Sequence, residues 1–277
     1  MAKDKVICSY KGFDKDMRCQ GFQYKEGKEY KHAGDVVCCP SDEDLKLGKG
    51  GFHACEYPLD VFGHYHPAYS VYHEVEQSGE TASGGDDTKI ASTVIKIGAK
   101  IDIKGLIKAS FDYVKERCTN TKSGKDRSAL NGGDRSALNG GNWSALNGGD
   151  RSALNGGDWS ALNGGDSSAL NGGNWSALNG GDWSALNGGY SSALNGGDWS
   201  ALNGGSESKL TGGKFSVVYG RGQDAQVRGG IGAVLALTEF DNEGDFKKVH
   251  VHAVDGKKIK ANTFYTLKNG KFAEVKL

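Results

Sequence analysis

A single eight-residue unit, x-x-Ser-Ala-Leu-Asn-Gly-Gly, is repeated ten times between Asp126 and Gly205. A unit this short cannot bury an apolar face by itself, so neighbouring units must stack and share one core. The unit is also too short for a helical repeat, and it shows no 3.6-residue periodicity. Four strand residues followed by Asn-Gly-Gly therefore predict a β-solenoid, in which the glycines take positive φ at each corner.

The alternation of side chains along a strand assigns the two faces of this solenoid. The second position of the unit holds Arg, Trp or Ser, and a position with that freedom is expected outside. Its period-two partner Ala then also points outward, whereas Ser128, Leu130 and their equivalents point inward. The Leu side chains should form a dry column, and Asn131 and its equivalents should stack as an amide ladder. The opposite arrangement, with Trp and Ala inside, is the alternative.

The repeat leaves the number of units in each coil open. With two units per coil, the residues other than Asp at the first position (Asn142, Asn174 and Tyr190) all fall on one side. This distribution favours a two-sided coil. A coil of three units groups Ser167 with Ser191 instead, so both sizes are kept as hypotheses.

Rows of Trp, Arg and Asp side chains are expected on the outer surface. Trp and Arg are over-represented among binding hot spots, and Trp is costly to expose to water. The residues predicted to bind a partner are Trp143, Trp159, Trp175, Trp183, Trp199, Arg127, Arg135 and Arg151. In a second interpretation the aromatic side chains only pack on one another and stiffen the sheet. In a third, the recurring Gly-Gly-Asp binds calcium, although the known calcium repeats have a period of nine.

The composition excludes several classes of partner. The chain has 277 residues, of which 34 are basic and 34 acidic, so its formal net charge is zero. This balance argues against a nucleic-acid partner. No segment is apolar over a membrane-spanning length, and the N-terminus lacks the apolar run of a signal peptide. The six Cys residues then predict reduced thiols in a cytosol. We expect no membrane association and no cofactor.

The repeats divide the chain into three predicted domains and a mainly β fold. Residues 1–117 are predicted to form an α+β domain, and residues 118–229 the octapeptide-repeat β-solenoid. Residues 230–277 are predicted to form a C-terminal β-meander that caps the last coil and protects its open edge.

Local signals in the flanks predict a few elements. Short helices are expected between Leu59 and Tyr72 and from Leu106 to Cys118. In the C-terminal part, Asp255-Gly256 and Asn269-Gly270 are typical of hairpin turns.

The same flanks carry a resemblance. The segments concerned are Lys11–Asp14, Arg18–Tyr24, Gly51–Asp60, Tyr72–Val75, Val254–Lys260 and Tyr265–Lys271. They resemble an uncharacterised family of phage and prophage proteins, whose members commonly join such an N-terminal domain to short Ser/Ala/Gly-rich tandem repeats. The resemblance implies a phage context, and with it the cytoplasm of the host cell, but no established activity.

The sequence gives only weak signals for metal-binding or catalytic residues. Cys19, Cys38, Cys39, His53 and Cys55 lack the spacing of paired zinc ligands. We therefore predict no metal site and assign no catalytic residue.

One enzymatic alternative is kept. The segment Gly50–Cys55, followed by Tyr69 and by Glu74 or Glu76, faintly resembles the layout of ADP-ribosyltransferases. In that layout a tyrosine-bearing helix frames nicotinamide and a later Glu orients the ribose. No early His or Arg motif precedes the segment, so this is a fold-level analogy. The segment Gly84–Asp87 is predicted to be a turn rather than a phosphate loop, because no Gly-Lys-Ser/Thr follows it.

These observations together predict a non-enzymatic interaction protein. Its rigid solenoid would present the Trp, Arg and Asp rows to a host protein, as a means of counteracting host defence, or to another copy of itself. The two alternatives are a modifying enzyme in the N-terminal domain and a structural protein that assembles into filaments.

Overall fold

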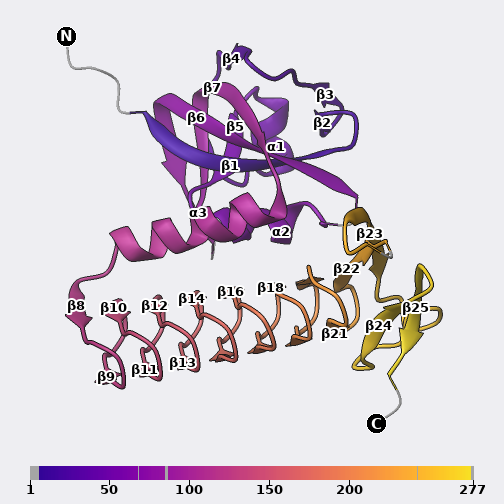
Figure 1. Cartoon of the computed structure of the whole chain (residues 1–277). Coiled ribbons are helices and arrows are strands. Elements are labelled where there is room, and N and C mark those ends of the chain that lie inside the picture. Colours follow the sequence, from indigo (N-terminus) through magenta and orange to yellow (C-terminus); the bar gives the residue numbers. More distant parts are fainter. Residues whose placement is uncertain (1–5, 68, 85–86, 242, 276–277) are drawn as a thin grey trace. The chain divides into compact units, whose positions relative to one another are not determined.

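The computed structural model describes residues 6–67, 69–84, 87–241 and 243–275. The chain forms two compact units, Met1–Leu106 and Ile107–Leu277, which are described separately (Figure 1). Of the predicted turn Gly84–Asp87, Gly85 and Asp86 lie outside the described residues. Within the described part, no helix is both long and apolar enough to cross a membrane.

The N-terminal unit is built on an antiparallel sheet of five strands in the order β4-β7-β5-β1-β6. The strands are β1 (Ile7–Asp14), β4 (Glu29–Lys31), β5 (Phe52–Cys55), β6 (Ser70–Ser83) and β7 (Lys89–Ile101). Because β6 also pairs with β7, the strands β7, β5, β1 and β6 close on themselves. A hairpin of β2 (Arg18–Cys19) and β3 (Phe22–Gln23) stands apart from this sheet.

The remaining elements of this unit are short. They are α1 (Asp42–Lys46), a 3-10 turn η1 (Pro58–Asp60), α2 (Val61–His64) and the start of α3 (Ile103–Glu116). The two predicted helices are confirmed as α2 and α3. The helix α1 has a capping box at Ser41 that satisfies its first backbone N–H groups. The core packs Phe13, Tyr24, Ala54, Val75, Ile95 and Ile97 together.

The repeats form a β-solenoid of about seven turns, as predicted. One parallel sheet contains β8 (Asn120–Ser123), β10 (Ser136–Asn139), β12 (Ala153–Asn155), β14 (Ala169–Asn171), β16 (Ala185–Asn187), β18 (Ala201–Gly204), β20 (Val217–Gly220) and β22 (Val234–Phe240). The other contains β9 (Ala129–Asn131), β11 (Ala145–Asn147), β13 (Ala161–Asn163), β15 (Ala177–Asn179), β17 (Ala193–Asn195), β19 (Lys209–Thr211) and β21 (Gln226–Arg228). Figure 1 shows the rungs stacked in one continuous row.

The strand register fixes the size of the coil. Ala153 pairs with Ala169, and Ala145 pairs with Ala161, so each strand lies beside the unit two repeats away. The coil is therefore two-sided and contains two units, and the three-unit hypothesis is wrong.

The inside of the coil holds the predicted residues. The Leu side chains from Leu138 to Leu210 are completely or almost completely buried and form one column. The Ser hydroxyls bond within and between coils. Ser168 Oγ accepts a hydrogen bond from Ser152 N at 3.3 Å and donates one to Gly149 O at 3.2 Å. These hydroxyl groups give buried backbone groups of neighbouring coils the hydrogen bonds that water cannot reach.

Two Asn ladders run along the coil, as predicted. Asn163 Nδ2 donates to Asn147 Oδ1 at 3.0 Å, and Asn187 Nδ2 donates to Asn171 Oδ1 at 2.7 Å. Each amide uses its donor on one neighbour and its acceptor on the other, which satisfies the column without water.

The corner geometry differs from the prediction. None of the repeat glycines has positive φ; instead the second position of every unit does, with φ values such as 63° at Trp143 and 55° at Ser167. The glycines are required by close approach. A Cβ on Gly172 would lie 2.8 Å from Leu178 Cδ1, and one on Gly165 would lie 2.0 Å from Asp150 Oδ1. The prediction was wrong because it explained the glycines by their backbone freedom. The structure instead requires glycine at these positions because a Cβ atom would not fit.

The two sheets of the solenoid differ at their Ala residues. The Ala side chains of β10, β12, β14, β16 and β18 are buried, whereas those of β11, β13, β15 and β17 are exposed. The sequence of the unit is the same on both sides, so the repeat alone does not set the exposure of Ala.

Each sheet of the solenoid ends in antiparallel strands of its own. The strand β23 (Phe246–Ala253) pairs with β22, while β24 (Tyr265–Lys268) and β25 (Lys271–Glu274) extend the sheet of β21. Asn269-Gly270 forms the turn between β24 and β25, as predicted. Asp255-Gly256 does not make a hairpin, because the strands on its two sides, β23 and β24, belong to different sheets.

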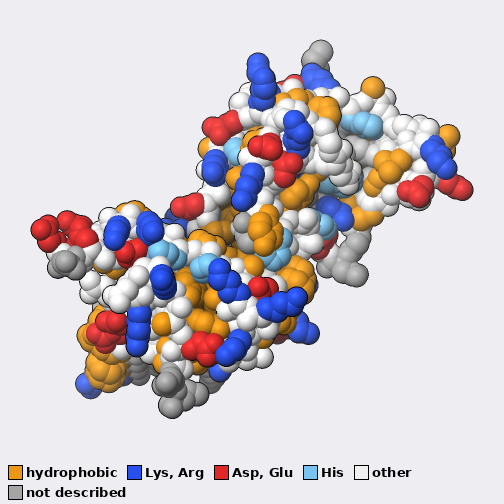
Figure 2. Space-filling model, turned by 90° about the vertical axis from the view of Figure 1, so that its right-hand side faces the viewer, with side chains coloured by type: hydrophobic (Ala, Val, Ile, Leu, Met, Phe, Trp, Pro, Cys, Tyr) orange, Lys and Arg blue, Asp and Glu red, His pale blue; other side chains and the backbone are white. Residues whose placement is uncertain are grey.

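The outermost strand of the first sheet, β23, has a mixed surface. It exposes Phe246, Val249 and Val251 beside the charged Lys247 and Lys248. Figure 2, which faces the side of these C-terminal strands, shows hydrophobic side chains interspersed with basic and acidic ones. Lysines on an edge strand oppose the addition of a further strand.

Candidate functional site

The structure places the eight predicted binding residues at the two corners of the coil. Trp143, Trp159 and Trp175 occupy one corner together with Arg127. Trp183 and Trp199 occupy the other, together with Arg135 and Arg151. This division follows from the two-unit coil, because side chains two units apart lie in the same column. All eight side chains are exposed or half-exposed.

The first column is an aromatic ladder. The ring centroids of Trp143 and Trp159 are 5.0 Å apart with nearly parallel planes, and those of Trp159 and Trp175 are 4.8 Å apart. Tyr190 ends the ladder with an edge contact to Trp175. The three indoles are 56%, 46% and 43% exposed.

The second column is a shorter ladder. Trp183 stacks on Trp199 at 5.2 Å, and Trp199 stacks on Phe215 at 4.5 Å. Phe215 continues the column beyond the uniform repeats, in a unit that has lost their sequence. Phe215 is not among the predicted binding residues, although it follows the repeats at the second position of an eight-residue unit that begins at Lys214.

The backbone at the corners holds these rings in register. Trp159 N donates to Asn174 O at 2.8 Å, a bond to the next coil that recurs at each corner. Every Trp of the two columns has the left-handed backbone conformation, and the planes of the stacked indoles are nearly parallel. Stacked rings at this spacing attract one another, so the ladders also stiffen the coil.

The Asp and Asn side chains at the first position of the unit form hydrogen bonds between coils. Asp126 Oδ1 accepts a hydrogen bond from Asn142 N at 2.8 Å, and Asn142 Oδ1 accepts one from Asp158 N at 2.9 Å. The bond needs only an acceptor oxygen at this position, which explains why both Asp and Asn occur there. The first position thus connects coils rather than selecting a partner.

The N-terminal unit contains a cavity of about 750 Å³. Its charged and imidazole side chains are Lys11, Lys49, Lys89, His32, His53 and His64, and neither Asp nor Glu is among its lining residues. Its aromatic side chains are Tyr10, Phe22, Tyr24, Phe52 and Tyr65. The volume suits a ligand of drug or cofactor size.

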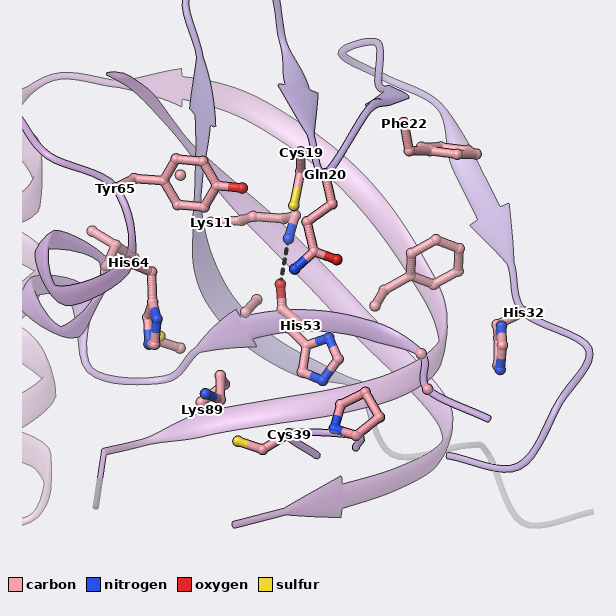
Figure 3. A pocket seen from close by; sticks show the side chains of 18 of the residues that line it. Lys11, Cys19, Gln20, Phe22, His32, Cys39, His53, His64, Tyr65 and Lys89 are labelled. Atoms are coloured by element: carbon pink, nitrogen blue, oxygen red, sulfur yellow. Dashed lines mark hydrogen bonds between the residues drawn. The ribbon is translucent and has the colours of Figure 1, made fainter. Parts of the chain in front are cut away.

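Lys11 is the most unusual residue of the cavity. Its side chain is 5% exposed, and its Nζ donates to the backbone oxygen of His53 at 2.7 Å (Figure 3). Among the described residues, no carboxylate lies within ion-pair distance of it. Burial lowers the pKa of Lys11, and the nearby thiols of Cys19 and Cys55 oppose that shift. A buried ammonium without a carboxylate is costly, and such groups are concentrated at functional sites.

One end of the cavity carries a Cys, His and Asp cluster. His64 Nε2 and Asp87 Oδ2 are 2.6 Å apart, and donor atoms of Cys55, His64 and Asp87 all lie within 4.8 Å of one another. These are ligand types that zinc accepts. His64 and Asp87 are, however, bonded to each other, and Lys11 and Lys89 act electrostatically on the Cys55 thiol. Both features oppose a cation, and we assign no metal to the cluster.

The other candidate ligands lie apart from this cluster. Cys38 and Cys39 have their sulfur atoms 4.0 Å apart, and Cys38 Sγ donates to backbone oxygens. All six Cys residues are free thiols. Cys55, His64 and Asp87 are distant in the chain, so their sequence spacing gives no signal of the cluster that the fold forms.

The residues of the ADP-ribosyltransferase analogy do not meet at the cavity. Tyr69 lies in a turn after α2, not in a helix, and is 61% exposed. Glu74 and Glu76 are exposed on β6, where Glu76 pairs with Lys96 at 3.1 Å. None of these three residues lines the cavity.

Comparison with known proteins gives one match. Residues 7–109 match the model of a family described as a domain of unknown function (DUF7666). No curated protein and no solved structure matches the chain. The matched segment contains every residue that lines the cavity, so a domain of unknown function occupies the N-terminal unit and carries this site.

Proposed function

We propose that this protein is a non-catalytic interaction protein whose solenoid binds a protein partner through its two aromatic ladders. The observation that supports the proposal is the exposure of about half of each indole in the first ladder, at fixed spacing and in a single orientation. A rigid surface loses little conformational entropy on binding, so its contacts contribute more to affinity.

The stacking geometry favours a protein over a glycan. Sugars pack against the faces of aromatic rings, and in the ladders those faces are covered by the next ring. The edges of the indoles stay exposed, with the Arg127, Arg135 and Arg151 side chains in the same two columns. Trp and Arg side chains of this kind are typical hot spots of protein interfaces.

The resemblance to phage proteins leads us to place the partner in the host cell. We propose a host protein, and inhibition of a host defence as the purpose of the contact. The location would then be the host cytoplasm.

Substitution of the ladders tests the proposal. The chain supplies its own control, since Ser167 and Ser191 occupy the Trp position with the same backbone conformation. The variant Trp143→Ser/Trp159→Ser/Trp175→Ser should therefore keep the coil while losing the first ladder. The full-length protein is used to capture partners from host lysate, and the affinity of the purified partner is then measured. We expect the affinity to fall about 30-fold or more, which corresponds to the loss of a single hot-spot residue of about 2 kcal/mol and is a lower bound for three, because hot-spot contributions are not additive.

Two further variants locate the surface. Trp183→Ser/Trp199→Ser removes the second ladder, and Arg127→Ser/Arg135→Ser/Arg151→Ser removes the basic side chains. Circular dichroism confirms that each variant keeps its strands. Undiminished affinity in all three variants would exclude the ladders as the binding surface.

Self-assembly is the second candidate function, and the first coil favours it. The strands β8 and β9 end their sheets, and Leu130 is only half-buried, unlike the Leu residues further along the column. Lys122 on β8 opposes strand addition there. Sedimentation velocity over a range of concentrations decides the matter, since filaments would grow with concentration and a constant monomer would exclude them.

A further inference from the structure

We propose that the cavity bounded by Lys11, Lys49 and Lys89 binds a small phosphorylated ligand that carries a flat ring, of the nucleotide class. This site is separate from the solenoid surface, and the proposal does not depend on the function assigned above.

The charge of the cavity selects an anion. Three Lys side chains line it and no carboxylate does. Lys49 has Asp44 at 3.8 Å, whereas Lys11 has no carboxylate within ion-pair distance among the described residues and contacts the His53 backbone oxygen, the Cys19 thiol and the Phe13 and Tyr24 rings. An ammonium group has three donor hydrogens, and a thiol and a ring are weaker acceptors for them than an anionic oxygen. A phosphate group would supply the missing negative charge and accept those hydrogens.

Two carboxylates near the cavity, those of Asp60 and Asp87, already form hydrogen bonds with other side chains. Asp60 Oδ2 accepts two hydrogen bonds from Thr88, at 2.8 and 2.6 Å, and Asp87 is bound to His64. Neither carboxylate forms an ion pair with Lys11 among the described residues. A bound anion would give Lys11 a direct partner of opposite charge.

The ends of the cavity provide flat, apolar walls. In Figure 3, Tyr65 and His64 lie on one side of Lys11, and Phe22 and His32 lie on the other. The Phe22 ring packs edge-on against Tyr24 and is 48% exposed. Such rings stack on a nucleobase, whereas a bare phosphate would gain nothing from them.

Two buried imidazole nitrogens of residues that line the cavity, His32 Nε2 and His53 Nε2, have no hydrogen-bond partner among the described residues. His32 Nε2 is the one at the aromatic end. A buried polar atom without a partner costs about 1–3 kcal/mol, and a ligand with polar ring atoms would satisfy it. The cavity thus combines a cationic centre with an aromatic end that has one polar atom to offer.

Calorimetric titration of the full-length protein tests the proposal. The probes are the four nucleoside monophosphates, the four nucleoside triphosphates, the free nucleosides and pyrophosphate. We expect at least one nucleotide to bind, with the matching nucleoside and pyrophosphate each at least tenfold weaker. Failure of every nucleotide at millimolar concentration would overturn the proposal, and so would a nucleoside or pyrophosphate that binds as tightly as the best nucleotide.

Lys11→Met distinguishes a binding role from a structural one. Met has a similar volume and no charge, so we expect nucleotide affinity to fall at least 30-fold while the melting temperature of the free protein stays level or rises. Lys100→Met, at an exposed position of β7, is the matched control and should bind normally. If Lys11→Met fails to fold, Phe22→Ala replaces it, and its affinity should fall at least fivefold.

Wild-type affinity in the folded Lys11→Met variant, or in Phe22→Ala where that variant stands in, would overturn the proposal. The Trp→Ser ladder variants should bind the nucleotide unchanged. The failure of one proposal can therefore be told from the failure of the other.

Discussion

The solenoid and the N-terminal unit treat buried polar groups in opposite ways. In the solenoid, most buried Ser residues and the Asn residues of the ladders bond to a counterpart one coil away, so translation pairs donor with acceptor. In the N-terminal unit, Lys11, Asp60 and His73 are buried and each has partners of a different kind: the His53 backbone oxygen, Thr88 and the Gly98 backbone oxygen. Of these three, Lys11 lines the cavity. The contrast teaches that a repeat satisfies its buried polar groups by translation, whereas the N-terminal unit satisfies each group separately and leaves the Lys11 charge without a carboxylate partner among the described residues.

The largest effect on stability is expected where a glycine of one coil lies close to the neighbouring coil. Gly165→Ala would place a Cβ 2.0 Å from Asp150 Oδ1 and disrupt the ladder of the first position. We expect a loss of about 3 kcal/mol in the free energy of unfolding, measured by chemical denaturation.

Gly133→Ala is the matched control for this effect. Gly133 has the same position in its unit, but a Cβ added there would meet nothing within 4 Å. Its loss should be well under 1 kcal/mol. Equal losses in the two variants would show that backbone freedom, rather than space, selects glycine here.

A smaller effect is expected from the inward hydroxyls. Ser168→Ala leaves Ser152 N and Gly149 O without their bonds to Ser168 Oγ, at a cost of about 1–3 kcal/mol. Ser144 is equally buried in the same kind of position, yet its Oγ has no partner among the described residues. Ser144→Ala should therefore be neutral or stabilising, and a loss as large as that of Ser168→Ala would contradict the pairing account.

The corner conformation gives a stabilising substitution. Ser167 has φ of 55°, and the left-handed region costs a non-glycine residue about 1–2 kcal/mol. Ser167→Gly removes that strain, although glycine also makes the unfolded chain more flexible. We expect a net gain of up to about 1 kcal/mol in thermal or chemical denaturation. Ala169→Gly, on the adjacent strand, should destabilise instead.

The smallest expected effect is a difference between the two regions in the pH dependence of their stability. Burial lowers the pKa of His53 below 6.5, and the Lys11 and Lys89 charges lower it further. A His with a lowered folded-state pKa contributes stability that is present above 6.5 and is lost as the pH falls through the lowered value. Hydrogen exchange, corrected for intrinsic rates, should therefore show faster opening of β5 in mild acid and no change in β12–β16.

His53→Gln should abolish this pH response of β5. Its persistence in that variant would assign the effect to another group. A matching response in the solenoid strands would contradict the contrast between the two regions.

Much of the solenoid could be predicted because its pattern is local and repeated. The inward Leu column and the Asn ladders follow from the alternation of side chains, which any coil must respect. The positive-φ residue was misplaced, because Gly is the usual choice there and the units use Trp, Arg and Ser instead. The cavity was missed, since Lys11, His53 and Lys89 come from three strands that only the closed sheet brings together.

The sequence by itself determined that the units must stack, which side chains fill the stack, and which side chains form its outer columns. The tertiary structure decided that two units close a coil, that Ala is buried on one sheet and exposed on the other, and that a lysine is buried without a carboxylate in ion-pair distance among the described residues. The physical reason is one of range. A short period fixes the contacts between identical neighbours, whereas coil closure, the exposure of a face and the surroundings of a charge depend on residues far apart in the chain.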